Sequence, residues 1–136
     1  SMADKNRMNA VKQVENALHY INRDAQMAEW REVLPTGTVA LTSGLTFSWT
    51  DYTVEPKAEN TVEYVLDSNG NLCREQRTIV DGSEDLKTSV IARNIDAAGS
   101  KYVFDGTVLT ITLTAAISGY KPAMETRTLS VSPRLK

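Results

Sequence analysis

The chain has little of the residue types that build catalytic and metal sites. It contains one cysteine, Cys73, and one histidine, His19, among its 136 residues. A single cysteine excludes an internal disulfide but leaves the redox compartment open. The sequence contains no Gly-rich phosphate loop, nucleophile elbow, Cys-x-x-Cys pair or His-Glu-x-x-His motif. We therefore expect no enzyme activity, no cofactor and no metal site.

Long apolar runs and an excess of positive charge are also missing. No run approaches the roughly 18–20 apolar residues that span a bilayer, and the first residues lack an apolar signal-peptide stretch. With 15 basic and 17 acidic residues, the formal net charge is −2, so no broad positive field attracts a nucleic-acid backbone. We expect the sequence as given to be soluble and not to bind nucleic acid.

Length and composition indicate one ordinary globular domain. A chain of 136 residues fits a single domain, and 41% hydrophobic with 24% charged residues is typical of a folded protein. We interpret residues 1–2, Ser-Met, as a remnant of tag cleavage and residues 3–136 as one soluble domain. Further natural sequence is expected to precede it.

The first part of the chain predicts one long amphipathic helix. Gly and Pro are missing from about 4 to 32, and apolar residues recur there in steps of three and four. This apolar stripe comprises Met8, Val11, Val14, Leu18, Ile21, Ala25 and Ala28. Because polar residues separate them, the stripe is narrow and one face should dock on a sheet. A helix of about 25 residues is roughly 38 Å long, so we expect its first turns to overhang.

After Pro35 and Gly37, which should end the helix, the apolar period changes to two. Residues 45–50, 62–66 and 108–114 alternate apolar and polar side chains, as half-buried strands do. Turn residues after the second and third of these segments predict two β-hairpins. The order of one helix and then strands, over about 37–134, predicts an α+β fold. One long N-terminal helix should pack on an antiparallel β-sheet, with room for a second small sheet.

The few chemically reactive residues have structural explanations. His19 lies on the predicted helix, but the sequence identifies no nucleophile or second base beside it. Cys73 lacks a second cysteine or histidine for a dyad, which favours an inert thiol. Residues 67–71, Asp-Ser-Asn-Gly-Asn, resemble the start of a calcium loop, but Thr78 stands where that loop needs its bidentate glutamate. A hairpin turn explains the same residues better.

Five segments carry a family resemblance. Residues 62–67 followed by 69–74 are similar to a "v-x-Y-x-L-d, turn, L-x-R" hairpin, and residues 90–95 to a "v-L-a-x-n-V" segment. Residues 128–134 are similar to a closing strand that ends in Pro-Arg, and residues 14–25 to the end of a long helix. In this arrangement they resemble the globular part of type IV pilin-like proteins. The resemblance is closest to the minor pilins and minor pseudopilins of type IV pilus and type II secretion systems.

The resemblance implies a non-catalytic structural subunit of a filament. Helices of many subunits would bundle at the filament centre, with the sheets outside. The helix face docking on the sheet would comprise Val14, Leu18, Ile21 and Ala25. Met8 and Val11, in the earlier turns, would contact neighbouring pilin or pseudopilin subunits.

The resemblance also implies a location. In that family a leader peptide and an apolar membrane-spanning half precede this part of the helix, and we expect both upstream of residue 3. The full-length protein would be anchored in the cytoplasmic membrane before assembly and then reach the periplasm or cell surface. Without that half, the isolated domain would be monomeric.

Two other functions remain open from the residues. A small-ligand or carbohydrate-binding module would use Trp49 and Tyr52, with Trp30, as an aromatic platform, although Trp49 continues an inward-facing strand pattern and is explained as core. An enzyme on the same scaffold would need His19 or Cys73 to point into a cleft beside a carboxylate.

Overall fold

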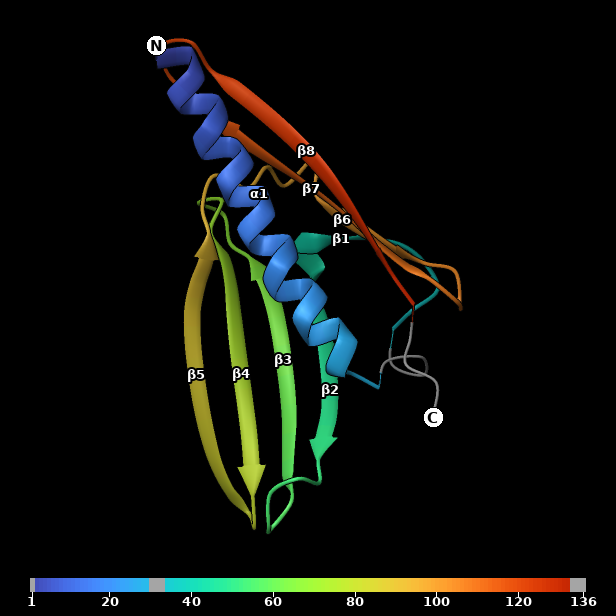
Figure 1. Cartoon of the computed structure of the whole chain (residues 1–136). Helices are drawn as coiled ribbons and strands as arrows, with labels where there is room; N and C mark the ends of the chain where they lie inside the picture. Colours follow the sequence, from blue (N-terminus) through green and yellow to red (C-terminus); the bar gives the residue numbers. More distant parts are fainter. Residues whose placement is uncertain (1, 30–33, 133–136) are drawn as a thin grey trace.

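A computed structural model describes residues 2–29 and 34–132. The chain begins with helix α1 (Met2–Met27) and continues in eight strands and one short 3-10 turn, η1 (Leu41–Ser43) (Figure 1). The strands are β1 (Gly37–Ala40), β2 (Leu45–Asp51), β3 (Ala58–Leu66), β4 (Leu72–Val80), β5 (Ser83–Ala92), β6 (Lys101–Phe104), β7 (Leu109–Ile117) and β8 (Ala123–Val131). No helix within these described ranges is both long and apolar enough to cross a bilayer.

The strands form two antiparallel sheets of four strands each. One has the order β2-β3-β4-β5 and the other the order β1-β6-β7-β8. Both predicted hairpins are confirmed: β3 pairs with β4 from Leu66↔Leu72, and β7 pairs with β8 up to Ile117↔Ala123. The α+β fold is therefore confirmed, but the second sheet is as large as the first rather than small.

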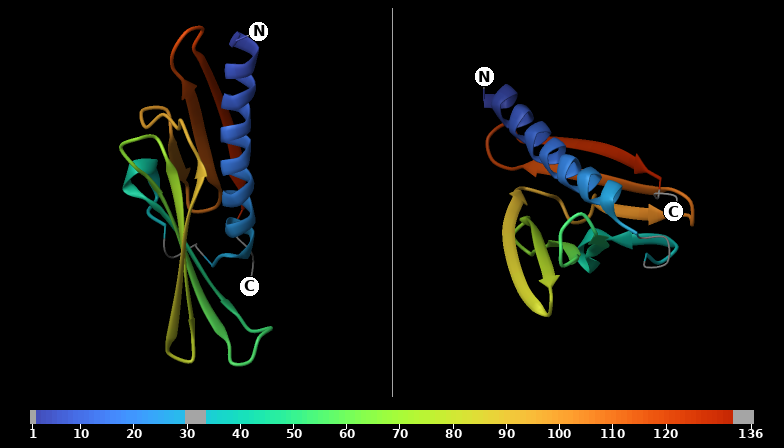
Figure 2. Two further views of the ribbon diagram at one scale, coloured as in Figure 1. Left: turned by 90° about the vertical axis from the view of Figure 1, so that its left-hand side faces the viewer. Right: turned by 60° about the horizontal axis from the view of Figure 1, so that its bottom comes forward.

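Helix α1 lies along the β7–β8 hairpin and crosses one end of the other sheet (Figures 1 and 2). Its buried residues are Ala10, Val14, Ala17, Leu18, Ile21, Asp24 and Ala25. The first turns do not overhang as expected, because the tip of the hairpin reaches them. The Asn6 side-chain amide donates to the carbonyl oxygens of Tyr120 and Lys121, at 3.3 and 2.9 Å.

The two sheets and the helix share one hydrophobic core. Phe47 and Tyr64 of one sheet and Ile111 and Leu113 of the other are fully buried in the same cluster as Ile21 of the helix. Folding thus removes apolar side chains of the helix and both sheets from water in one core, which is the main favourable contribution to folding. The opposite half of the β2–β5 sheet extends beyond the end of α1 (Figure 2).

The helix ends earlier than its apolar pattern predicts. It was expected to reach about residue 32, but α1 stops at Met27, and the backbone amide of Glu29 donates to the carbonyl of Ser48 in β2 at 2.9 Å. A strand partner thus satisfies this amide in place of a helical carbonyl. Residues 30–32, including Trp30, lie outside the described residues, as do the strand positions expected at 133–134.

The orientation of α1 makes a stability prediction. Ile21→Ala removes a fully buried side chain and should lower the free energy of unfolding by about 2–5 kcal/mol. Met8→Ala, on the same helix but 72% exposed, should change it by about 0.5 kcal/mol or less. Urea unfolding followed by circular dichroism measures both. Equal effects of the two variants would contradict this orientation of the helix.

Candidate functional site

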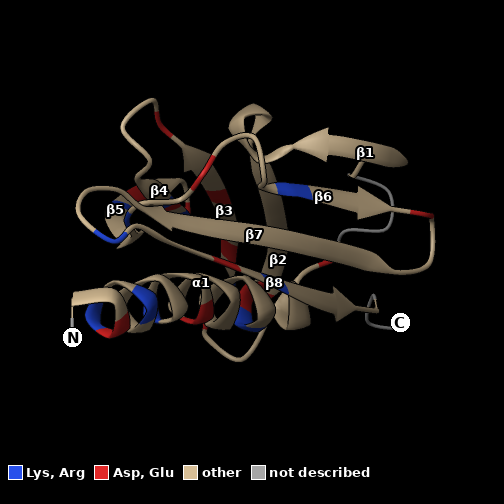
Figure 3. Ribbon diagram, turned by 90° about the horizontal axis from the view of Figure 1, so that it is seen from above, with Lys and Arg blue, Asp and Glu red and all other residues tan. Residues whose placement is uncertain are grey.

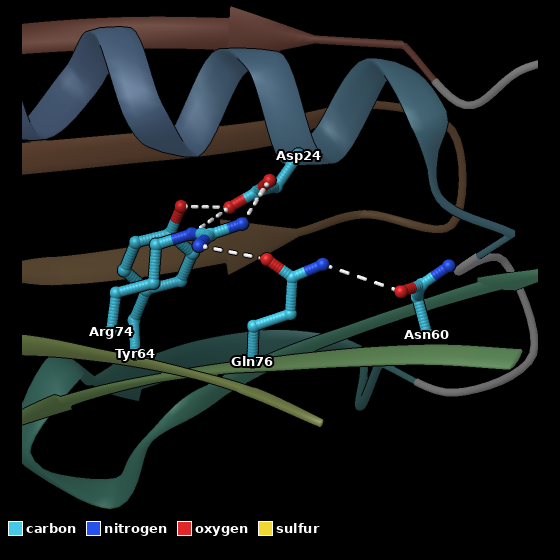
Figure 4. A network of polar contacts seen from close by, with 5 residues as sticks. All are labelled: Asp24, Asn60, Tyr64, Arg74 and Gln76. Atoms are coloured by element: carbon cyan, nitrogen blue, oxygen red, sulfur yellow. Dashed lines mark hydrogen bonds and ion pairs between the residues drawn. The ribbon is translucent and has the colours of Figure 1, made fainter. Parts of the chain in front are cut away.

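A buried ion pair joins α1 to the β2–β5 sheet (Figure 4). The Arg74 guanidinium, from β4, donates through Nε to Asp24 Oδ2 at 2.8 Å and through Nη2 to Asp24 Oδ1 at 2.9 Å. The hydroxyl of Tyr64, from the neighbouring strand β3, donates to the same Oδ2. Asp24 is 1% exposed and Arg74 is 9% exposed, so the contact is shielded from water. Such a two-pronged pair is geometrically specific as well as strong.

The polar contacts continue away from the helix along the inner face of the sheet. Arg74 Nη1 donates to Gln76 Oε1 at 3.2 Å, and Gln76 Nε2 donates to Asn60 Oδ1 at 3.3 Å. The hydroxyl of Thr78 donates to the same Asn60 oxygen at 2.8 Å. Among the described residues, no buried side-chain nitrogen or oxygen lacks a partner. The network is thus fully satisfied, which is the condition for a buried polar cluster to be tolerated.

The surroundings of the pair keep Tyr64 and Arg74 protonated. Burial, and then the hydrogen bond to Asp24, raise the pKa of Tyr64 far above its ordinary value, so its hydroxyl stays a donor. The hydrogen bond to Asp24 raises the pKa of Arg74, which stays a cation. The ring of Tyr20 adds a cation–π contact, with its centroid 5.9 Å from the Arg74 guanidinium carbon. The arrangement holds α1 in place and offers no free base or nucleophile.

Sequence reasoning missed this network. In the sequence, Asp24 is one of several polar residues between the apolar positions of the helix, although it lies three residues after Ile21 and next to Ala25, on the docking stripe. A carboxylate within an apolar stripe is itself a signal, because a buried charge needs a partner. The identity of that partner, fifty residues further along the chain, has no local signal in the sequence.

Helix α1 presents a polar face with a few apolar residues to solvent. Both basic and acidic residues occur along the helix (Figure 3). Seven residues of this face line an open groove of about 560 Å³: Arg7, Met8, Val11, Lys12, Glu15, Asn16 and His19. Met8 is 72% exposed and Val11 is partly buried. The groove therefore contains both residues that the sequence suggests for subunit contacts.

The four residues suggested for the docking face lie under the helix. Val14, Ile21 and Ala25 are fully buried and Leu18 is 9% exposed, all within the common core. The face that they share with Asp24 is the one turned toward the sheets. The contacts of Asp24 with Arg74 and Tyr64, which we call the clamp, thus lie on the same surface of the helix as its apolar face.

The structure does not bring His19 and Cys73 into a common site. His19 is exposed on α1, with its ring edge-on to Tyr20 at a centroid distance of 6.0 Å. Cys73 precedes Arg74 in β4 and is partly buried. Because side chains alternate along a strand and Arg74 faces the helix, Cys73 faces away from it. Within the described residues, no group of three or more His, Cys, Asp or Glu side chains is placed to hold a metal ion.

Trp49 and Tyr52, suggested for a sugar platform, differ in their exposure to solvent. Trp49 is 8% exposed and belongs to the core, whereas Tyr52 is 73% exposed after the end of β2. The Lys57 ammonium lies 6.0 Å from the Tyr52 ring centroid. Trp30, the third ring of that platform, lies outside the described residues.

The turn that resembles a calcium loop closes the β3–β4 hairpin. One Asp67 carboxylate oxygen accepts the backbone amides of Asn69 and Asn71, at 2.8 and 2.9 Å. The other accepts the Asn71 side-chain amide at 3.2 Å. The backbone hydrogen bond from Asn71 is the main cause that lowers the pKa of Asp67. The carboxylate stabilises the turn itself, as an Asx turn does.

The buried pair predicts a large effect of a small change. Asp24→Ala leaves the Arg74 cation buried without its partner and should lower the free energy of unfolding by about 3–5 kcal/mol. Arg7→Ala removes the more exposed pair with Glu125, whose closest atoms are 3.5 Å apart, and should cost less than about 1 kcal/mol. Urea unfolding at neutral pH compares the two. A loss below about 1 kcal/mol for Asp24→Ala would show that the pair does not hold the helix.

Tyr64 predicts how stability depends on alkaline pH. Its folded pKa is raised, so the unfolded chain loses the tyrosine proton first, near pH 10, while the folded chain keeps it. The contribution of protonated Tyr64 to the free energy of unfolding should be fully present below about pH 10. Above that pH it should fall, with a slope of up to about 1.4 kcal/mol per pH unit. Tyr64→Phe should reduce that slope, and Tyr52→Phe, at an exposed position, should leave it unchanged. Urea unfolding between about pH 9 and 11.5 measures the slopes; equal slopes for all three proteins would contradict this.

The chain was compared with known protein families, curated proteins and solved structures. No family model, curated protein or solved structure matches it. The structure itself shows an α+β fold with its N-terminal helix packed on antiparallel sheets.

Proposed function

We propose that this chain is a non-catalytic structural subunit of a type IV pilin-like filament, in the position of a minor pilin or minor pseudopilin. The observation that carries the proposal is the two-sided character of α1. One face is buried on the sheets from Ala10 to Ala25, while Met8, on the same helix, is 72% exposed beside an open groove. In a filament of this kind, the docked face holds the domain and the free face meets other helices.

The clamp supports this proposal through rigidity. A subunit whose helix lies in a filament core must transmit the position of that helix to its outer domain. The Asp24–Arg74 pair, with Tyr64, makes three charge-assisted hydrogen bonds from one helix position to two strands. Rotation of α1 about its axis would separate the pair and leave the Arg74 cation in the sheet without its partner, which is costly. The pair therefore favours one orientation of the helix on the sheets.

The free face of α1 also suits contacts with similar helices. Arg7, Lys12 and Glu15 surround the apolar residues Met8 and Val11 in the groove. Mixed charges around a narrow apolar strip are typical of helices that pair with selected partners, because the charges disfavour wrong alignments. The proposed partners are pilin or pseudopilin subunits, and the proposed location is the cytoplasmic membrane before assembly and the periplasm or cell surface afterwards.

The gene and a cross-linking experiment test the proposal. We expect the natural gene to encode about 20 apolar residues and a short basic leader upstream of residue 3. In the full-length natural protein, a photo-crosslinker at Met8 should form an adduct with another subunit through that subunit's N-terminal helix. Mass spectrometry of the cross-linked peptides identifies the partner segment. The same crosslinker at Met124, which is 65% exposed on β8, is the matched control and should give no helix adduct.

Two results would overturn the proposal. One is a natural gene without the apolar segment. The other is a cross-linking experiment in which Met8 gives no more adduct with the N-terminal helix of another subunit than Met124 does.

A further inference from the structure

Strand β5 is an edge strand whose residues are mostly exposed. It is the last strand of its sheet, and away from the end that α1 reaches, no other described segment lies beside its outer edge in these views (Figures 1 and 2). Every residue from Ser83 to Val90 is exposed, and its pairing with β4 is regular over this stretch. The stretch contains no proline, glycine or bulge, so its outward backbone groups form a continuous template for another strand.

The end of the same edge is already covered by α1. The Asn16 side-chain amide donates to the carbonyl of Ile91 at 2.6 Å, and the Gln13 side-chain oxygen accepts the backbone amide of Arg93 at 2.8 Å. From Ile91 onward, the edge is therefore not free for pairing. The open template is limited to residues 83–90, and its middle lies at Leu86 and Lys87.

The side chains of this stretch are self-complementary about one residue. Asp85 and Lys87 pair with Thr78 and Gln76 of β4, so they share the inner face of the sheet, while Leu86 lies on the outer face. If two copies of β5 pair antiparallel about Leu86, Asp85 of each copy lies opposite Lys87 of the other. Leu86 then meets Leu86. Neither Asp85 nor Lys87 takes part in an ion pair among the described residues, so both charges are available.

Other registers are less favourable. When a two-fold axis relates two antiparallel strands, residues opposite each other lie on the same face of the joined sheet. Each possible register is therefore centred on one residue, which lies opposite its own copy. Pairing about Lys87 sets two cations directly opposite, and pairing about Asp85 sets two anions opposite, both of which destabilise. Pairing about Thr88 sets residues 83–85 opposite residues 91–93, where α1 covers the edge, so only residues 86–90 can pair. The register about Leu86 avoids all three penalties.

We propose that two copies of this chain associate through antiparallel pairing of β5 about Leu86, joining their four-stranded sheets into one sheet of eight. The interface is isologous, so each copy supplies the same strand and the assembly closes as a dimer. Because one strand pair buries less than the roughly 1,000 Å² of a stable interface, the dimer is weak and forms at high protein concentration. The proposal does not depend on the filament function, since it uses a different surface and needs no other subunit type.

Charge reversal tests the pairing. Asp85→Lys sets a new lysine opposite Lys87 twice, and Lys87→Asp sets a new aspartate opposite Asp85 twice; each should raise the dimer dissociation constant about tenfold. An equimolar mixture of D85K and K87D restores both opposite-charge pairs and should dimerise like the original chain. Lys101→Asp, an exposed position on β6 of the other sheet, is the matched control and should leave dimerisation unchanged. Sedimentation equilibrium of the chain, the variants and the mixture measures these effects.

Cysteine cross-linking tests the register. In a Cys73→Ser background, Leu86→Cys places two thiols directly opposite, with Cα atoms about 4.5–5.5 Å apart, within the range of a disulfide. Thr88→Cys lies opposite residue 84, so its own copy is about 14 Å away and should not form a disulfide. Oxidation followed by non-reducing electrophoresis should give a covalent dimer for Leu86→Cys alone.

The proposal is overturned by any of three results. The first is a monomer at every concentration up to about 1 mM. The second is a dimer whose affinity D85K and K87D leave unchanged, or whose affinity their mixture does not restore. The third is a disulfide that forms equally well from Thr88→Cys and Leu86→Cys.

Discussion

The buried contact between Asp24 and Arg74 is the constraint on which the rest of this structure depends. Hydrophobic burial alone is not directional, so the apolar stripe of α1 could pack on the sheets at several rotations. A buried carboxylate, by contrast, is tolerated only where cationic and hydroxyl donors meet it. Arg74 and Tyr64, on neighbouring strands, provide those donors at one place. The apolar residues thus supply most of the stabilisation, and the ion pair selects one orientation.

The selected orientation decides which parts of α1 are free. With Asp24 and Ile21 turned toward the sheets, Met8 faces solvent and Asn16 and Gln13 reach the end of β5. The helix therefore covers one end of the sheet edge as a consequence of the same rotation. The proposed filament contact and the proposed dimer contact lie on different surfaces, but both are defined by how the clamp sets the helix.

Sequence reasoning could predict what depends on local pattern. The long helix follows from the three- and four-residue spacing of Val14, Leu18 and Ile21, and the β3–β4 hairpin follows from the turn after Leu66. The two equal sheets could not be predicted, because β1 pairs with β6 across more than sixty residues. The chain changes sheets at η1, followed by Gly44 with φ of 88°, and a short turn of this kind carries no signal of which strand comes next. The clamp was missed for the same reason, since Asp24 and Arg74 are fifty residues apart.

The open edge of β5 shows how one strand can be both protected and specific. An uncovered strand of regular geometry is a general risk for aggregation, and charged side chains on such an edge are a common defence. Asp85 and Lys87 provide that defence, because a copy of β5 paired about either of these residues places like charges together. Charges of opposite sign two residues apart, however, cannot repel every partner: a copy of the same strand, reversed about the residue between them, meets each charge with its opposite. The feature that excludes random pairing therefore leaves one alignment favourable, and that alignment is with the chain itself.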